Sequence, residues 1–187
     1  LKNNILYKYI VNDLNAQQSS ADQRDNTIDS IRAFLSKYQS YSKLASTEMT
    51  DMLSNADLSK NATITSDNLK MTIKRADASD KVFSNVIGIR WMKSINGCDY
   101  LMLDLTFRNG LLIGMLDQRS VYAIGDTSVN ISKEQAIATA MKYIQNYSYT
   151  VPHGVEIFGF NVTEERTVTQ LAPVLRESDT LYPSWNV

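Results

Sequence analysis

The stretch Tyr100–Met115, YLMLDLTFRNGLLIGM, decides the fold class predicted for this chain. Before its Asn109–Gly110 pair, alternate apolar residues share one face of an expected strand: Leu101, Leu103, Leu105 and Phe107. Asn-Gly is typical of a type I′ turn, because both residues accept a positive φ. After the pair, the apolar positions continue at Leu111, Ile113 and Met115. The sequence therefore predicts a β-hairpin that turns at Asn109–Gly110.

The residues before this hairpin extend it into a sheet. Ala62–Ala76 alternates apolar and polar residues and predicts one strand, and Val82–Ile95 predicts another. Asn96–Gly97 is a second turn signal, which would join Val82–Ile95 to the hairpin. We therefore expect an antiparallel β-meander.

A helical pattern precedes the meander. Between Ile28 and Met52 the apolar residues recur in steps of three and four, interrupted at Ser42, which predicts one helix of about 25 residues. We expect its apolar stripe to pack on the protein's own sheet; a second helix, from the same or another chain, is the alternative. Residues 1–26 predict an additional amphipathic helix, to about Gln18, followed by a polar linker.

The last third of the chain returns to a helix and then to strands. Ser132-Lys133-Glu134-Gln135 matches a capping box, in which the N-cap hydroxyl and the N3 side chain each bond the other residue's backbone N–H. The apolar face of the helix that follows consists of Ala136, Ile137, Ala140, Met141 and Ile144. Strands are expected at Val155–Val162 and Arg166–Leu175, and another begins at Tyr182. Pro173 and Pro183 mark edges or bends, since proline cannot donate to a central ladder.

Residues 129–144, VNISKEQAIATAMKYI, and the later Tyr182-Pro-x-Trp185 resemble a PepSY-type domain. The resemblance implies a capped helix on a small antiparallel sheet. It also implies a binding, inhibitory or chaperone-like module outside the cytoplasm, with no catalytic residues to carry over. Residues 27–126 are interpreted as an earlier, diverged copy of the same order.

Together these patterns predict an α+β fold in which a helix packed on an antiparallel β-meander occurs twice, αβββ-αβββ, after an extra N-terminal helix. The expected parts are an N-terminal helix and polar linker (1–26), a long-helix unit (27–126) and a PepSY-like unit (127–187), the last one C-terminally incomplete. Both chain ends are expected to be cut points within a longer protein.

The composition excludes several classes of function. Lys+Arg 19 against Asp+Glu 20 gives a net charge of -1, so no overall field attracts nucleic acid or an acidic membrane. Basic residues such as Lys70, Lys74 and Arg75 are interleaved with acids, and no apolar run approaches the roughly 20 residues of a membrane span. We therefore predict neither a nucleic-acid partner nor a membrane-spanning segment.

One cysteine and one histidine exclude internal disulfides, Cys/His zinc clusters and multi-histidine metal sites. His153, in Val-Pro-His-Gly, is interpreted as a solvated turn residue. Cys98 is interpreted as partly buried and inert, with an intermolecular disulfide as the alternative; as a nucleophile it would need His153 as its base. The carboxylates of Asp99, Asp104 and Asp117 lack calcium-loop spacing, and Glu164–Glu165 predicts a solvated turn. The sequence predicts no catalytic residue, metal or cofactor.

Four Asn-x-Ser/Thr sequons are glycosylation candidates, at Asn61, Asn130, Asn146 and Asn161. Beside the resemblance, they favour an extracellular or cell-surface location. The predicted function is a non-enzymatic, extracytoplasmic protein-interaction module of PepSY type, acting on a protein partner or by self-association. The alternative is a structural subunit of a cell-surface layer or filament, assembling through helix or sheet-edge contacts. A hydrolase using the scattered carboxylates is the third hypothesis.

Overall fold

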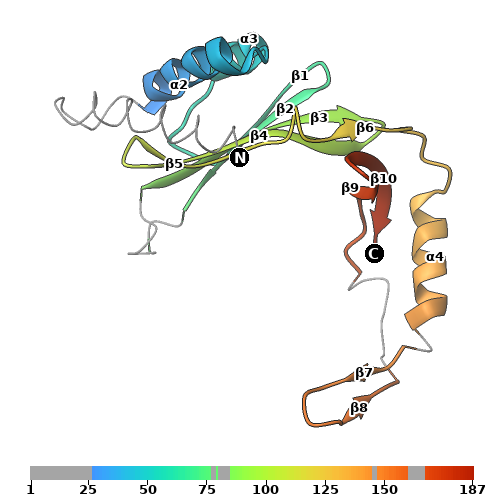
Figure 1. Ribbon diagram of the computed structural model, residues 1–187. Helices are drawn as coiled ribbons and strands as arrows, with labels where there is room; N and C mark the ends of the chain where they lie inside the picture. Colours follow the sequence, from blue (N-terminus) through green and yellow to red (C-terminus); the bar gives the residue numbers. More distant parts are fainter. Residues whose placement is uncertain (1–26, 77–78, 80–84, 145–146, 160–166) are drawn as a thin grey trace. The chain divides into compact units, whose positions relative to one another are not determined.

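The computed structural model describes residues 27–76, 79, 85–144, 147–159 and 167–187 (Figure 1). The helix predicted within residues 1–26 lies outside this range. The chain divides into two compact units: the first reaches to Ser94 and resumes over Tyr100–Tyr122, and the second comprises Ile95–Asp99 and Ala123–Val187.

Two helices, instead of the single long one predicted, open the described part of the first unit. Helix α2 spans Thr27–Ser42 and α3 spans Thr47–Ser54. Lys43 adopts a left-handed conformation (φ 62°), and the Gln39 side chain accepts a hydrogen bond from the Ser46 N–H at 2.9 Å across the break. The prediction of one helix is therefore wrong. The sequence pattern did not reveal the break, because the apolar stripe stays in phase across it and both helices turn the same side to the sheet.

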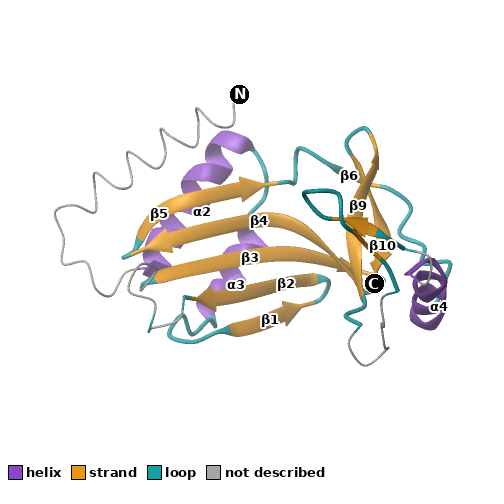
Figure 2. Cartoon of the chain, turned by 90° about the horizontal axis from the view of Figure 1, so that it is seen from below, coloured by secondary structure: helices purple, strands orange, loops and turns teal. Residues whose placement is uncertain are grey.

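The predicted meander is confirmed as a five-stranded antiparallel sheet with strands in sequence order (Figure 2). Its strands are β1 (Ala62–Ser66), β2 (Leu69–Arg75), β3 (Val86–Ile95), β4 (Cys98–Arg108) and β5 (Leu111–Asp117). Asn96–Gly97 joins β3 to β4, and Asn109–Gly110 joins β4 to β5. All four turn residues have φ between 50° and 79°, as type I′ turns require.

Two details of the sheet differ from the prediction. Ala62–Ala76 is a hairpin of two strands, because Asp67 (φ 49°) makes a turn inside the stretch. In β5 the buried residue is Leu112, while Ile113 is exposed. A register shift in β4 between Thr106 and Phe107 places Phe107 opposite Leu112, which reverses the expected alternation.

The core of the first unit lies between the two helices and one face of the sheet. The helices contribute Ile31, Phe34, Leu35, Tyr38, Met49, Met52 and Leu53, and the sheet contributes Met71, Ile73, Ile89, Trp91, Leu103, Leu105 and Phe107, among others. Phe34 and Tyr38 stack with ring centroids 5.5 Å apart. The interpretation that the helical stripe packs on the protein's own sheet is thus confirmed.

Arg119, just beyond β5, ties the α2–α3 connection to the sheet. Its guanidinium pairs with Asp117 at 2.7 Å, and the two side chains are only 7% and 6% exposed. It also donates to the Ala45 carbonyl at 2.8 Å and lies over the Tyr38 ring. Burial, followed by the nearby Asp117 carboxylate, raises the pKa of Tyr38 to about 12. Asp117, one of the scattered carboxylates in the sequence, therefore belongs to a structural ion pair with Arg119.

The second unit contains short elements around one longer helix. They are β6 (Ala123–Ile124), α4 (Lys133–Ile144), β7 (Tyr149–Thr150), β8 (Glu156–Ile157), β9 (Gln170–Glu177) and β10 (Thr180–Asn186). One sheet has the order β6-β10-β9, with a parallel β6–β10 pair, and β7 pairs with β8. Of the strand predicted over Val155–Val162, residues 155–159 are described, and within them only β8 forms a strand.

The α+β class is confirmed, but the twofold αβββ repeat is not. The first unit holds a meander, whereas the sheet of the second unit has the order β6-β10-β9 and includes a parallel pair. No helix in the described ranges is long and apolar enough to cross a membrane.

Candidate functional site

Helix α4 begins with the capping box that its sequence predicted. The Gln135 N–H donates to the Ser132 hydroxyl at 3.2 Å, and the Ser132 N–H donates to Gln135 Oε1 at 2.8 Å. The hydrogen bond from Ser132 is also the main cause of a lowered pKa of Glu134, in the first turn. The start of α4 is thus set locally, by four consecutive residues.

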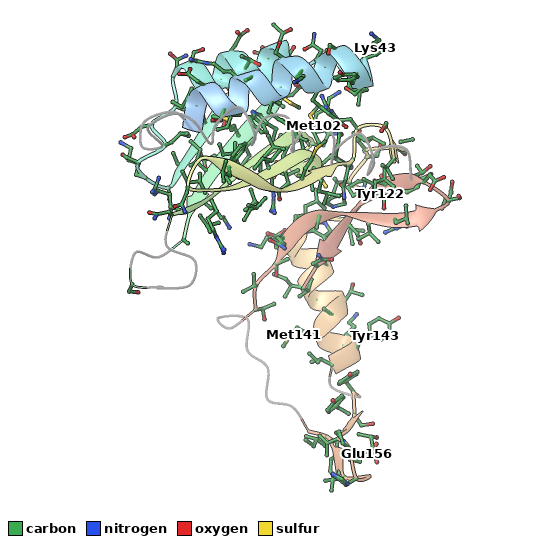
Figure 3. All side chains as sticks on the ribbon, turned by 60° about the vertical axis from the view of Figure 1, so that its left-hand side comes forward. Lys43, Met102, Tyr122, Met141, Tyr143 and Glu156 are labelled. Atoms are coloured by element: carbon green, nitrogen blue, oxygen red, sulfur yellow. The ribbon has the colours of Figure 1, made fainter. Side chains whose placement is uncertain are left out.

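The predicted apolar face of α4 is only partly covered. Ala136 is buried, while Ile137, Ala140, Met141 and Ile144 are half-buried. Tyr143 is 77% exposed, and Figure 3 shows its side chain extending away from the helix. A helix of this length normally buries its apolar stripe fully, so α4 retains apolar surface that packing within the described residues does not use.

The Tyr-Pro-x-Trp stretch connects β10 to the segment before α4. The Trp185 indole N–H donates to the Ile131 carbonyl at 3.0 Å. Three residues earlier, the Tyr182 ring lies so close to Gly125 that an added Cβ would be 2.5 Å from its nearest carbon. A hydrogen bond to Glu177 raises the pKa of the Tyr182 hydroxyl. Tyr182 and Trp185 therefore hold β6, β10 and the start of α4 together.

Both open edges of the β6-β10-β9 sheet carry a proline. The Leu181 carbonyl accepts from the Gly125 N–H at 2.9 Å, so the backbone groups of Leu181 and, two residues later, Pro183 face the β6 side of β10. Only Thr180 and Leu181 pair with β6, and Pro183 lies opposite Pro173 of β9. Each outward edge thus lacks an N–H near its middle, which hinders the addition of another strand. Of the two prolines predicted to mark edges or bends, Pro173 lies on the edge strand β9, and Pro183 lies on the part of the central strand β10 that does not pair with β6.

The β7–β8 hairpin carries an apolar cluster, here called the hairpin cluster: Tyr147, Tyr149, Val155, Ile157 and Phe158. All five are exposed, and Phe158 is 76% exposed. The turn is closed by a hydrogen bond from the Val151 N–H to the Val155 carbonyl at 2.9 Å. A two-stranded hairpin of this size has little stability of its own in water, and its apolar side chains are available for contact.

The described residues of the second unit from Ala123 onward have almost no core. From Ala123 onward, Ala136 is the one residue that is buried among those the structure describes. The same part of the chain holds most of the exposed large hydrophobic residues of the described structure. Besides the hairpin cluster and Tyr143, they are Ile124, Val129, Ile131, Val168, Val174, Leu175 and Val187. Sequence periodicity could not reveal this, because an apolar stripe looks the same whether or not it is covered.

The structure places most of the residues that the sequence singled out for possible chemistry. His153 is exposed in the β7–β8 turn, with a φ of 88°. Cys98 is fully buried at the start of β4, where the sequence predicted partial burial. Asp104 pairs with Arg90, so it and Asp117 serve in ion pairs at different places. Glu164–Glu165 lies outside the described residues.

The described residues do not bring acidic groups together in a metal-binding cluster of three or more. A depression of about 370 Å³ between α3 and the β1–β2 turn is lined by Glu48, Asp51 and Asp67, among others. The carboxylates with shifted pKa values within the described structure are shifted downward. Hydrogen bonds from Ser59 lower the pKa of Asp57 to about 2, and those from Ser128 lower the pKa of Asp126. Such groups are turn acceptors, unlike a general acid, whose pKa is raised.

Two of the four predicted glycosylation sites fall within the described residues, and both are exposed. The Asn61 side-chain oxygen accepts from the Arg75 N–H at 2.7 Å, and Asn130 lies two residues before the α4 N-cap. Asn146 and Asn161 lie outside the described residues.

No family model, curated protein or solved structure matches this chain. The resemblance to a PepSY-type domain therefore stays a prediction from the α4 and Tyr182–Trp185 motifs.

Proposed function

We propose that this protein is a non-enzymatic, extracytoplasmic protein-interaction module of PepSY type, and that it binds its partner through the second unit. The observation that carries the proposal is the exposed apolar surface of that unit, formed by the hairpin cluster, Tyr143 and the half-buried face of α4.

Burial of apolar area is the dominant favourable term in most protein association, and aromatic side chains contribute most per residue. Fully covering an exposed side chain of phenylalanine size contributes roughly 1.5–3 kcal/mol before the costs of ordering. Exposed patches of this kind mark interaction sites in soluble proteins. A partner that covers Tyr143 and Phe158 would stabilise the second unit at the same time.

The polar groups of the second unit support binding over catalysis, because they are engaged in local structure. Ser132 caps α4, Asp126 accepts from Ser128, and Tyr182 is hydrogen-bonded to Glu177. An acid or base for catalysis needs a perturbed, accessible group near a place for a substrate.

The structural-subunit alternative is favoured by one observation, the uncovered stripe of α4. A second copy of the chain could cover that stripe by helix packing. Assembly through the edges of the β6-β10-β9 sheet has less support, since Pro173 and Pro183 interrupt both open edges. Of the two assembly routes, helix contacts through α4 are therefore the better supported.

Site-specific photo-crosslinking tests the proposal. A photoreactive residue replaces Phe158 or Tyr143 in the protein expressed in its source cells. Tyr41, an exposed tyrosine on α2, is the matched control. The expected result is one defined heterologous adduct from both second-unit positions and none from position 41. An adduct of twice the chain mass, also formed by the purified protein, would support the structural-subunit alternative. No adduct above the control would refute both.

The location is tested separately by intact-mass measurement on native material. Glycan mass that disappears in Asn61→Gln or Asn130→Gln would support passage through a secretory route. Unmodified protein that is also protected from protease added to intact cells would refute the extracytoplasmic part of the proposal.

A further inference from the structure

Strand β5 forms one edge of the five-stranded sheet, and among the described strands only β4 pairs with it (Figure 2). The Gln118 N–H, just beyond β5, donates to the Met102 carbonyl of β4 at 2.9 Å. Backbone groups of alternate residues face the same neighbour, so those of Leu116 also face β4, whereas those of Met115 and Asp117 face outward. The outward side of β5 therefore offers a row of N–H and C=O groups to which another strand can bond.

The sequence of β5, LLIGMLD, is apolar on both faces of the strand. Leu112 is buried and Met115 packs against the core, while Ile113 and Leu116 are each 50% exposed. Strands that are covered on both faces have continuous apolar runs, whereas strands with one face in water alternate apolar and polar residues. The run in β5 is thus typical of a covered strand, but the described residues leave half of the Ile113 and Leu116 side chains open.

Other sheet edges in the described structure are short or interrupted. Natural edge strands avoid association by being short or by carrying proline or charged side chains. Pro173 and Pro183 interrupt the edges of the β6-β10-β9 sheet, and β7 and β8 have two residues each. Strand β1, at the opposite edge of the first sheet, has five residues, of which the exposed ones are threonine and serine. Strand β5 has seven residues and no proline, and its one charged side chain, Asp117, pairs with Arg119. Of these edges, β5 is the one suited to strand addition.

We propose that β5 pairs antiparallel with β5 of a second copy of this chain, which joins two five-stranded sheets into one of ten strands. An added strand places alternate side chains beside Leu116 on one face and beside Met115 on the other, so it must be apolar on both faces. Strand β5 is itself such a strand. Antiparallel self-pairing is also two-fold symmetric, the commonest symmetry of soluble oligomers. The edge belongs to the first unit, so the proposal is independent of the surface proposed above.

The backbone sets the centre of this pairing. Because the N–H and C=O groups of Met115 face outward, Met115 can exchange both hydrogen bonds with Met115 of the second copy. Asp117 then lies opposite Ile113 of the second copy, and the two Asp117 residues are about 14 Å apart along the strands. Each Asp117 is also neutralised by its own Arg119, so like charges do not oppose each other across the contact.

The size of the contact predicts its strength. Each side of a standard interface contributes about 20–30 residues. Strand β5 contributes seven, without a charge that would steer association. We therefore expect a weak dimer, with a dissociation constant on the order of 0.1 mM.

Sedimentation velocity of the purified chain, from about 10 μM to about 1 mM, tests the proposal. The parent should change from monomer to dimer over this range. Ile113→Lys places a charge on the edge and should weaken dimerisation at least about tenfold. The control Thr65→Lys places the same charge on an exposed position of the edge strand β1 and should change dimerisation less than about twofold. A parent that stays monomeric at about 1 mM, or equal effects of the two lysines, would overturn the proposal.

Disulfide trapping tests the register and covers the case in which Ile113→Lys does not fold. In Met115→Cys the two new thiols face each other across the two-fold axis, with Cα atoms about 5.5 Å apart, a distance that a disulfide spans. In the control Leu116→Cys the two Cα atoms are more than about 7 Å apart, which a disulfide does not span. Mild oxidation should yield covalent dimer several-fold faster from Met115→Cys, although position 116 is the more exposed. Covalent dimer from both variants equally, or from neither, would overturn the proposal.

Discussion

Arg119→Met tests how the buried ion pair stabilises the first unit. The substitution keeps most of the side-chain volume but leaves the Asp117 carboxylate buried without its cation, and it removes the hydrogen bond to the Ala45 carbonyl. Removing one partner of a buried pair costs about 3–5 kcal/mol. Asp117 still accepts from the backbone N–H of residue 119 at 2.9 Å, which places the expected loss near the lower end, about 3–4 kcal/mol.

The double variant Asp117→Asn/Arg119→Met provides the control. It removes both charges while the asparagine oxygen can still accept from the backbone, so the expected loss falls to about 1–2 kcal/mol. Urea unfolding followed by Trp91 fluorescence measures both, because Trp91 is fully buried in the first unit; a Trp185→Phe background removes the other tryptophan. At an m-value of about 2 kcal/mol/M, the single variant should lower the unfolding midpoint by about 1.5–2 M.

Two results would refute this reasoning. A single variant within about 0.5 kcal/mol of the parent would mean that the ion pair and the carbonyl contact contribute little. A double variant as unstable as the single one would mean that the loss does not come from a stranded carboxylate.

Three further changes have outcomes that the structure specifies. Gly125→Ala should open the second unit and increase hydrogen exchange in β10, because the new Cβ would lie 2.5 Å from the Tyr182 ring. Gly88→Ala is the control: the atom nearest to its Cβ is 3.8 Å away, and the change should cost no more than about 1 kcal/mol. Equal hydrogen exchange in both variants would contradict the Tyr182 contact. Ser132→Ala removes the N-cap hydroxyl of α4, which should cost about 1 kcal/mol and lower helicity at the start of the helix. NMR chemical shifts measure that helicity, and unchanged shifts would show that the cap is dispensable. The pKa of Tyr38 is raised from 10.0 to about 12 in the folded protein. The stability that this shift contributes is therefore complete below pH 10 and is lost as the pH rises through 12. The free energy of unfolding of Tyr38→Phe should decline less over this window than that of the parent, and an identical decline would refute the assignment.

Local signals predicted much of the first unit's sheet and the start of α4. Asn96–Gly97 and Asn109–Gly110 favour type I′ turns between apolar strands, because a positive φ costs little at these residues. The Ser132–Gln135 capping box likewise depends only on neighbours along the chain. The helix break at Lys43 was missed, because periodicity reports which face is apolar and not whether the backbone is continuous.

The candidate surfaces were less predictable, because exposure depends on how distant segments pack. The apolar run of β5 was predicted as a strand of the hairpin, but strand pairing decides that it lies at the edge of the sheet. The uncovered stripe of α4 was predicted as a stripe, but its exposure depends on what other elements leave open.

The sequence by itself determined the α+β class, the order of the antiparallel meander, its two Asn-Gly turns and the cap of α4, since each follows from short-range backbone preferences. Only the tertiary structure decided that Arg119 reaches the Ala45 carbonyl, that Pro173 and Pro183 lie opposite each other, and that the apolar residues of the second unit stay exposed. These are contacts, or missing contacts, between residues distant in the chain, and no local preference encodes them.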